Sequence, residues 1–356
     1  MKKLFCVILC LMFLFSSCAP QNKDNIGASS APSDITSSEL KEESIPITEN
    51  EKTEESFVSE EEEEIPSSSE EEEEEEKELV FSTTDRTKYD NNFKLYGTYT
   101  GKEKLEKLNL SVPDPENEAG LSETKTGYSF GVAKNSKAHN TSLNHQSRYE
   151  KGGYNALTVD TKSEEKVLYL TFDCGYELGY TSTILDILKE ESVPAAFFCT
   201  LSQIKKNPEL IARTIEEGHK VGNHSVSHPE FPSVSRTKMV EEILGVENYL
   251  RENFGYSSPY FRFPTGAYSD SSLDLVTKIG FRSVFWSVAY KDYDPKDQPG
   301  KDVAFKTVTD RLHPGAVILL HNVSLSNTEA LRDIIDYAKE NGYTFKSLDD
   351  YSSWVK

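Results

Sequence analysis

The chain has few cysteines, no excess of basic residues and no apolar run long enough to cross a membrane. Its 60 acidic residues outnumber 39 basic ones and give a formal net charge of −21. Nucleic-acid binding needs a basic surface, so no nucleic-acid partner is predicted. The apolar run at the start, Leu4–Phe15, has 12 residues, whereas a membrane-spanning helix needs about 20. Of five cysteines, two lie inside this run, which leaves Cys18, Cys174 and Cys199 for any other role.

The first 18 residues have the pattern of a secretory signal. Two lysines precede the apolar run, and two serines lie between it and Cys18. Small residues directly before a cysteine resemble the lipobox of bacterial lipoproteins. We therefore predict that residues 1–18 are a lipoprotein-type signal, that Cys18 is lipidated, and that the protein is extracytoplasmic and anchored to the membrane by this lipid. The alternative is an ordinary signal peptide with an incidental cysteine.

Most of the negative charge lies in a linker that follows the signal. Residues 1–80 carry 22 acidic and 6 basic residues, including the glutamate runs Glu60–Glu64 and Glu70–Glu76. Such runs repel themselves and cannot form a core, so we expect residues 19–80 to be a disordered acidic tether. Residues 81–165 are polar and weakly periodic, and they predict an irregular N-terminal extension. Residues 166–356 then form the main domain, which we expect to be a monomer.

From Val167 onward, apolar runs alternate with amphipathic helical patterns. This alternation predicts an α/β fold with a parallel sheet, either a barrel or an open sheet. The expected strands are residues 167–173, 194–199, 260–263, 281–288 and 316–321, and the expected helices are residues 181–191, 208–217, 236–253, 271–279, 303–312 and 328–341. Asp173, Arg262, Asp292 and His321 all fall at or after the ends of expected strands, the edge that carries the chemistry in barrel folds.

A carboxylate and a pair of histidines suggest metal-assisted hydrolysis. Asp173 ends an apolar run, and His224 and His228 lie four residues apart, the spacing that puts two imidazoles on one face of a helical turn. We predict that His224 and His228 bind a divalent metal, zinc, and that Asp173 is the general base. Alone, the carboxylate could cap the next segment, and the histidines could be a surface pair.

Three further motifs would complete such a site. Arg262 could hold Asp173 ionised, and the backbone N–H of Thr265 could donate to a developing oxyanion. His321 follows a buried apolar run and is predicted to be the general acid, although it could be a core histidine. Asp292 could orient a catalytic partner or simply belong to an acidic turn.

Together and in this order, these motifs resemble those of the polysaccharide deacetylase (NodB-homology) family of carbohydrate esterases, over residues 165–352. The family implies a distorted parallel (β/α) barrel and metal-dependent removal of acetyl groups from sugars. The resemblance is greatest to the branch that deacetylates N-acetylmuramic acid in peptidoglycan during synthesis of the muramic δ-lactam of spore cortex. It rests on residues 175–177, 179–181, 222–225, 284–289, 313–316 and 343–350.

Two positions differ from the family pattern. Cys174 stands where most members have an aspartate that binds the metal. A thiolate could replace it as a zinc ligand, or Cys174 could be a bystander, with the metal held weakly or not at all; a Cys174–Cys199 disulfide would compete with any role in the site. Thr265 stands where the muramic branch tends to have a basic residue.

The predicted activity is therefore removal of N-acetyl groups from peptidoglycan strands, with N-acetylmuramic acid as the substrate. The alternatives are deacetylation of N-acetylglucosamine or of an O-acetylated polysaccharide, and a cell-wall sugar-binding pseudoenzyme that lacks turnover.

Overall fold

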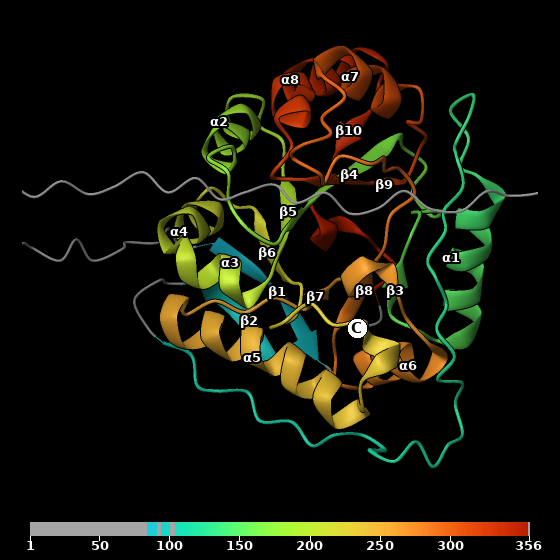
Figure 1. The fold of residues 1–356 in the computed structure, drawn as a ribbon, viewed down its shortest axis with the longest axis vertical. Helices are drawn as coiled ribbons and strands as arrows, with labels where there is room; N and C mark the ends of the chain where they lie inside the picture. The colour runs from blue at the N-terminus through green and yellow to red at the C-terminus, as the bar shows by residue number, and fades with distance from the viewer. Residues whose placement is uncertain (1–83, 91–93, 100–103, 355–356) are drawn as a thin grey trace, which may run out of the picture. The chain divides into compact units, whose positions relative to one another are not determined.

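The computed structural model describes residues 84–90, 94–99 and 104–354 (Figure 1). The predicted signal (1–18) with Cys18 and the predicted tether (19–80) lie outside the described residues. Strands β1 (Thr84–Asp90) and β2 (Lys94–Tyr99) pair with each other antiparallel. No helix among the described residues is both long and apolar enough to cross a membrane.

The centre of the fold is a distorted parallel barrel, which confirms the predicted fold class. Neighbouring strands follow the order β10-β4-β5-β6-β7-β8-β3, β9 also pairs with β4, and every strand pair in this sheet is parallel. A single parallel bridge between Val288 and Ile318 connects the segment after β8 to β9 and closes the ring. The strands are β3 (Ala156–Leu157), β4 (Val167–Cys174), β5 (Ala195–Cys199), β6 (Lys220–Asn223), β7 (Tyr260–Phe261), β8 (Arg282–Val284), β9 (Ala316–His321) and β10 (Thr344–Phe345).

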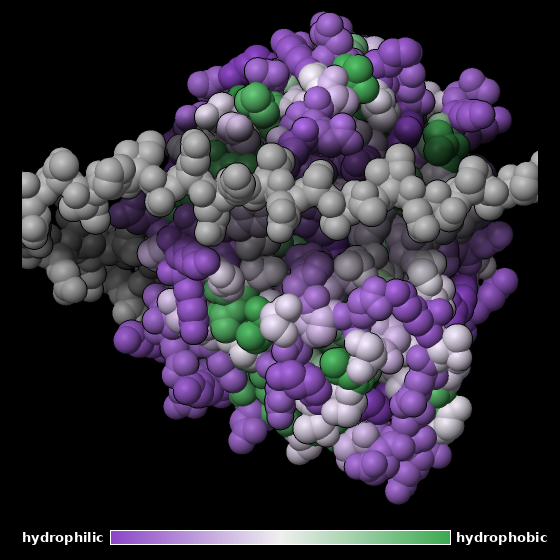
Figure 2. Space-filling view, viewed as in Figure 1, coloured by the Kyte–Doolittle hydropathy of each residue, from purple (hydrophilic) through white to green (hydrophobic). Residues whose placement is uncertain are grey.

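Helices lie around the outside of these strands (Figure 1). Their apolar faces pack on the sheet and their polar faces are exposed, so the visible surface is mainly hydrophilic with scattered hydrophobic groups (Figure 2). The helices are α1 (Asn140–Gly152), α2 (Thr181–Glu190), α3 (Leu201–Lys206), α4 (Pro208–Glu216), α5 (Arg236–Phe254), α6 (Asp270–Lys278), α7 (Lys301–Thr309) and α8 (Leu325–Glu340).

Strand β4 separates two parts of the core, because successive side chains of a strand point to opposite faces. Leu170, Phe172 and Cys174 pack in the cluster that contains apolar residues of α2, α4 and α8. Val167 and Tyr169 pack instead in a second cluster with residues of β5, β7 and β9. Asp173 continues this second face and therefore points toward the inside of the barrel.

The segment 81–165, predicted to be irregular, contains helix α1 and strand β3. The side chains that α1 buries are Ser142, Gln146 and Tyr149, which have helical spacing but are mostly polar, so the apolar pattern did not reveal the helix. Strand β3 pairs with β8 and belongs to the sheet. The folded domain therefore begins before residue 166. Strands β1 and β2 also lie in this segment, and they and the short elements α3, β6 and β10 were not predicted.

Candidate active site

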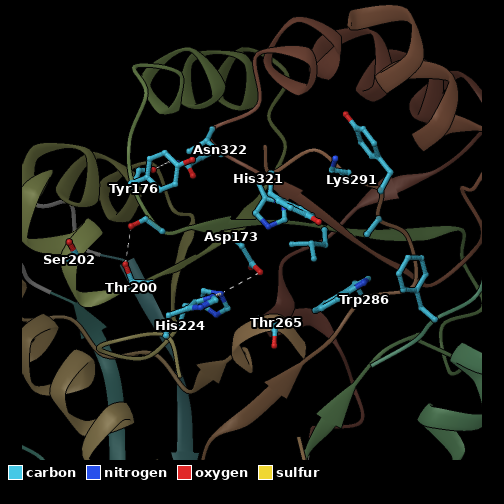
Figure 3. A pocket seen from close by; sticks show the side chains of 18 of the residues that line it. Asp173, Tyr176, Thr200, Ser202, His224, Thr265, Trp286, Lys291, His321 and Asn322 are labelled. Atoms are coloured by element: carbon cyan, nitrogen blue, oxygen red, sulfur yellow. Dashed lines mark hydrogen bonds and ion pairs between the residues drawn. The ribbon is translucent and has the colours of Figure 1, made fainter. Parts of the chain in front are cut away.

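A cavity of about 1210 Å³ opens at the carboxyl ends of the barrel strands. Asp173, His224, His228, Thr265 and His321 line it, so five predicted site residues meet there although 148 positions separate the first from the last. Figure 3 shows His321 and Asp173 facing each other, with His224 and Thr265 below them. Aromatic side chains from distant segments complete the wall, namely Phe130, Tyr176, Trp286, Tyr290 and Tyr293.

Asp173 forms a buried ion pair with Arg262, as predicted. Arg262 Nη1 lies 2.8 Å from Asp173 Oδ1, and the arginine side chain is fully buried. Its other N–H groups donate to Val284 O at 2.8 Å and to Thr171 Oγ1 at 2.9 Å. Burial opposes ionisation of Asp173, but the Arg262 guanidinium, together with the neighbouring His224 and His321, outweighs this effect and holds the pKa of Asp173 below its usual value. The carboxylate is therefore ionised and available to accept a proton.

His224 and His228 converge, but not on a helical turn. The segment that joins them is a loop, in which Ser225 (φ 67°) and His228 (φ 58°) adopt the left-handed conformation. This conformation folds the loop back, so that the two Nε2 atoms lie 3.2 Å apart. The prediction of a helical turn is therefore wrong, whereas the prediction that the two imidazoles lie together is correct.

The protonation state of both histidines suits metal binding. His224 Nδ1 lies 2.9 Å from the carbonyl oxygen of Arg262, which can only accept, so Nδ1 carries the proton and the lone pair of Nε2 faces the cavity. Burial lowers the pKa of His224 to about 4 and also lowers the pKa of His228. Both rings are neutral at pH 7, as a metal ligand must be.

The spacing of the two nitrogen atoms fits one zinc ion. With Zn–N distances of about 2.0–2.1 Å and tetrahedral angles, two ligating nitrogens lie about 3.3–3.4 Å apart, close to the 3.2 Å between the Nε2 atoms. Asp173 Oδ2 lies 3.6 Å from His224 Nε2. Within the described residues, however, no group of three or more His, Cys, Asp or Glu side chains surrounds one position. The residues thus fit a metal held by two imidazoles, with the remaining positions open.

Cys174 does not line the cavity. Its side chain is buried in the apolar cluster outside the barrel, and Sγ lies 3.9 Å from the carbonyl oxygen of Phe172. Burial, together with the neighbouring Cys199, raises the pKa of this thiol well above its usual value. Cys174 and Cys199 are register partners on β4 and β5, and both are free thiols. This placement supports a packing role for Cys174, and its role as a metal ligand stays a prediction.

His321 and Asp292 form a second pair. Asp292 is fully buried; its Oδ1 lies 2.7 Å from His321 Nδ1, and its Oδ2 accepts the backbone N–H of His321 at 2.8 Å. Burial would lower the pKa of His321, but the carboxylate of Asp292 outweighs burial and raises it. Asp173 and His321 are register partners on β4 and β9. The residue suited to be the base and the residue suited to be the acid therefore lie next to each other at the carboxyl ends of neighbouring strands.

Thr265 lies in a tight turn after β7. It has a φ of 56°, and the N–H groups of the next two residues, Gly266 and Ala267, are used within the turn. The N–H of Thr265 has no acceptor among the described residues. Gly266 permits this turn, because its φ is 68° and a Cβ atom there would lie 2.8 Å from the Trp286 ring. Thr265 lines the cavity, and the role of its N–H as the oxyanion donor stays a prediction.

Glu242 is a positioning residue that the sequence did not reveal. This buried residue of α5 accepts from both the backbone N–H (2.7 Å) and the hydroxyl (2.8 Å) of Ser227. It fixes the loop that carries the two histidines. The sequence did contain one indication of this role, because Glu242 is an acidic residue on the apolar face of the helix expected over residues 236–253.

Comparisons with known proteins agree with this geometry. Residues 160–284 match a family model described as polysaccharide deacetylase. An uncharacterised 30.6 kDa protein of Geobacillus stearothermophilus is 46% identical over 198 residues, which are 55% of this chain and 74% of that protein. The peptidoglycan-N-acetylmuramic acid deacetylase PdaA of Bacillus subtilis is 42% identical over 189 residues, 53% of this chain and 72% of the relative.

The structure of Bacillus subtilis PdaA, described as a family 4 carbohydrate esterase, superimposes with a TM-score of 0.61 at 37% identity. The superposition covers 65% of this chain and 98% of that one. This likeness extends beyond the segment matched by the family model and includes the barrel that positions the site. The chain belongs to the polysaccharide deacetylase family of hydrolases.

Proposed function

We propose that this enzyme removes the N-acetyl group of N-acetylmuramic acid in peptidoglycan. The observation that carries the proposal is the convergence of two ion-paired catalytic groups and a neutral histidine pair on one cavity. The Bacillus subtilis relative named for this substrate supports the choice of sugar. The freed amine could then condense with the lactyl carboxyl group and form the muramic δ-lactam of spore cortex.

In the proposed reaction, Asp173 accepts a proton from the water that attacks the acetyl carbon. The N–H of Thr265 donates to the oxygen that becomes negatively charged. His321, held as an imidazolium by Asp292, donates a proton to the departing nitrogen as the C–N bond breaks and acetate leaves. A divalent metal held by His224 and His228, zinc in our proposal, would supply Lewis-acid stabilisation of the developing charge.

The cavity also suits a carbohydrate chain. Tyr176 and Tyr293 line it and keep 47% and 54% of their surface exposed, so their rings are available to contact sugar faces. The Tyr293 ring packs edge-on against His321 at 5.6 Å between centroids. A sugar that contacts Tyr293 would therefore lie beside the proposed acid.

The proposed location follows from the N-terminal sequence. We propose that Cys18 is lipidated and that the acidic segment allows the domain to reach the wall from the membrane. Cys18→Ala should then release the protein from the membrane fraction; unchanged association would exclude the lipid anchor.

The decisive experiment is incubation of the purified protein with defined muropeptides. Mass spectrometry should show loss of one acetyl group from N-acetylmuramic acid. Acetyl loss from N-acetylglucosamine alone would correct the substrate, and glycan binding without acetate release at any divalent ion would indicate a pseudoenzyme. Asp173→Asn should abolish acetate release while the protein remains folded.

A further inference from the structure

Arg311 is a cation in the wall of the active-site cavity. It follows α7, precedes β9, and is half-buried. Its Nη1 atom donates to the carbonyl oxygen of Ala289. A guanidinium has five N–H donors in a fixed planar arrangement, and no carboxylate of the described residues forms an ion pair with this one. Most of its hydrogen-bonding capacity is therefore available.

The other formal charges of the cavity wall are compensated. Asp173 is paired with Arg262, and Lys291 Nζ lies 2.6 Å from Asp297 Oδ2. The Asp297 carboxylate also raises the pKa of Lys291. Within the described part of the chain, Arg311 is thus the cavity-lining charge that lacks a partner of opposite sign.

The surroundings of Arg311 favour an anionic ligand. The carbonyl group that it contacts belongs to Ala289, which is buried, and Leu319, a member of the same apolar cluster as Ala289, is also buried and lines the cavity. Hydrogen bonds and ion pairs are stronger beside apolar walls than in water, because the local dielectric is lower. A carboxylate fits this donor geometry, since its two oxygens can accept two parallel N–H groups.

We propose that Arg311 binds a carboxylate of the substrate and sets the preference for an acidic amino sugar. This inference rests on the proposed function and names the group that recognises its substrate: the lactyl carboxylate of muramic acid, which lies on the sugar carbon next to the acetamide.

The test compares two substrates that differ at one group. A disaccharide of N-acetylglucosamine and N-acetylmuramic acid with a free lactyl carboxylate is compared with the same disaccharide carrying a lactyl carboxamide. The full-length protein should prefer the acid by about 10- to 100-fold in kcat/KM, mainly through KM, as expected for charge-assisted hydrogen bonds. In Arg311→Gln this ratio should fall toward one, whereas Arg311→Lys should keep part of it.

Two further variants make the test specific. Lys306→Gln removes the same charge from the exposed side of α7, where Lys306 pairs with Asp310, and it should leave the acid-to-amide ratio unchanged. Lys291→Gln tests the lysine of the cavity wall. An unchanged ratio in Arg311→Gln, or a ratio that falls in Lys291→Gln instead, would overturn the assignment.

Acetate, the second product, is also a carboxylate and could be the ligand of Arg311. If Arg311→Gln weakens inhibition by acetate but keeps the acid-to-amide ratio, the cation serves product binding and the proposal is wrong. Calorimetry measures the affinity of the two disaccharides independently of turnover, and so tests this inference separately from the proposed function. If neither is deacetylated but the acid binds more tightly in an Arg311-dependent way, the proposed function fails and the carboxylate site stands; equal binding of both overturns the site.

Discussion

Replacement of Arg262 by methionine tests the electrostatic basis of the site. Arg262 is fully buried, it contacts Asp173 at 2.8 Å, and its guanidinium carbon lies 4.1 Å from the centroid of the Phe198 ring. Methionine can fill most of the space but brings no charge and no donor. Asp173 would then remain as a buried carboxylate without its cation, and the carbonyl oxygen of Val284 would lose its hydrogen bond.

The expected loss of stability is about 3–5 kcal/mol near pH 7, the usual cost of removing one partner from a buried ion pair. Its pH dependence has a definite sign. In the wild type the lowered pKa of Asp173 contributes stability above the unfolded-state pKa, and this contribution is lost as the pH falls. In Arg262→Met, burial becomes dominant and raises the pKa of Asp173, so stability falls as the pH rises through that range. The difference between the two proteins should shrink toward acidic pH.

Urea denaturation at several pH values, combined with a double-mutant cycle, measures this effect. Asp173→Asn in the Arg262→Met background should recover part of the loss, with a coupling energy of about 2 kcal/mol or more. Arg236→Met is the matched control, because Arg236 is also buried and pairs with an aspartate, Asp274, at 3.3 Å. It should show no coupling to Asp173→Asn. Additive effects at Arg262 and Asp173, or a loss that does not depend on pH, would refute the reasoning.

Three other predictions concern separate parts of the site. Asp292→Asn should lower kcat by about 10²–10⁴ and move the alkaline limb of the pH–rate profile to lower pH, because burial then dominates the pKa of His321; an unmoved limb would contradict this pairing. His228→Ala should weaken zinc binding by more than about 100-fold, since even outer-shell changes cost about 10–100-fold; metal content after dialysis measures it, and full retention of zinc would remove His228 from the ligand set. Cys174→Asp should lower the free energy of unfolding by about 2–5 kcal/mol, because it buries a carboxylate in an apolar cluster; a zinc titration that shows tighter binding would instead assign position 174 to the metal.

The sequence predicts β4, β5 and β9 well, because strands of a buried parallel sheet are continuous apolar runs. The expected strand 281–288 is wrong in its bounds, since only Arg282–Val284 forms a strand. The run that ends at His321 has the predicted bounds of β9, and β4 is one residue longer than expected. Strand β6 was missed because Val221 is its one aliphatic residue. Its Gly222 is required by close packing, since a Cβ atom there would lie 2.6 Å from the Phe198 ring. Such a requirement depends on the folded neighbours and cannot be read from composition.

The sequence predicted which residues meet in the site better than it predicted the backbone conformation that brings them together. Spacing indicated that His224 and His228 act together, but it could not indicate left-handed residues in the loop or the support from Glu242. Likewise, the ambiguity at Cys174 could not be resolved from sequence, because it depends on where β4 ends. The strand continues through residue 174 in register with Cys199, so alternation directs the thiol away from the cavity.

Asp173 and His321 need opposite protonation states although they are register partners on neighbouring strands. Separate partners make this possible: Arg262, directly after β7, lowers the pKa of Asp173, and Asp292, in the segment between β8 and α7, raises that of His321. Both partners come from the side of the barrel that the Val288–Ile318 bridge joins to β9. The pH interval in which base and acid coexist in their active forms therefore depends on the segments after β7 and β8, which the closed barrel brings next to the ends of β4 and β9.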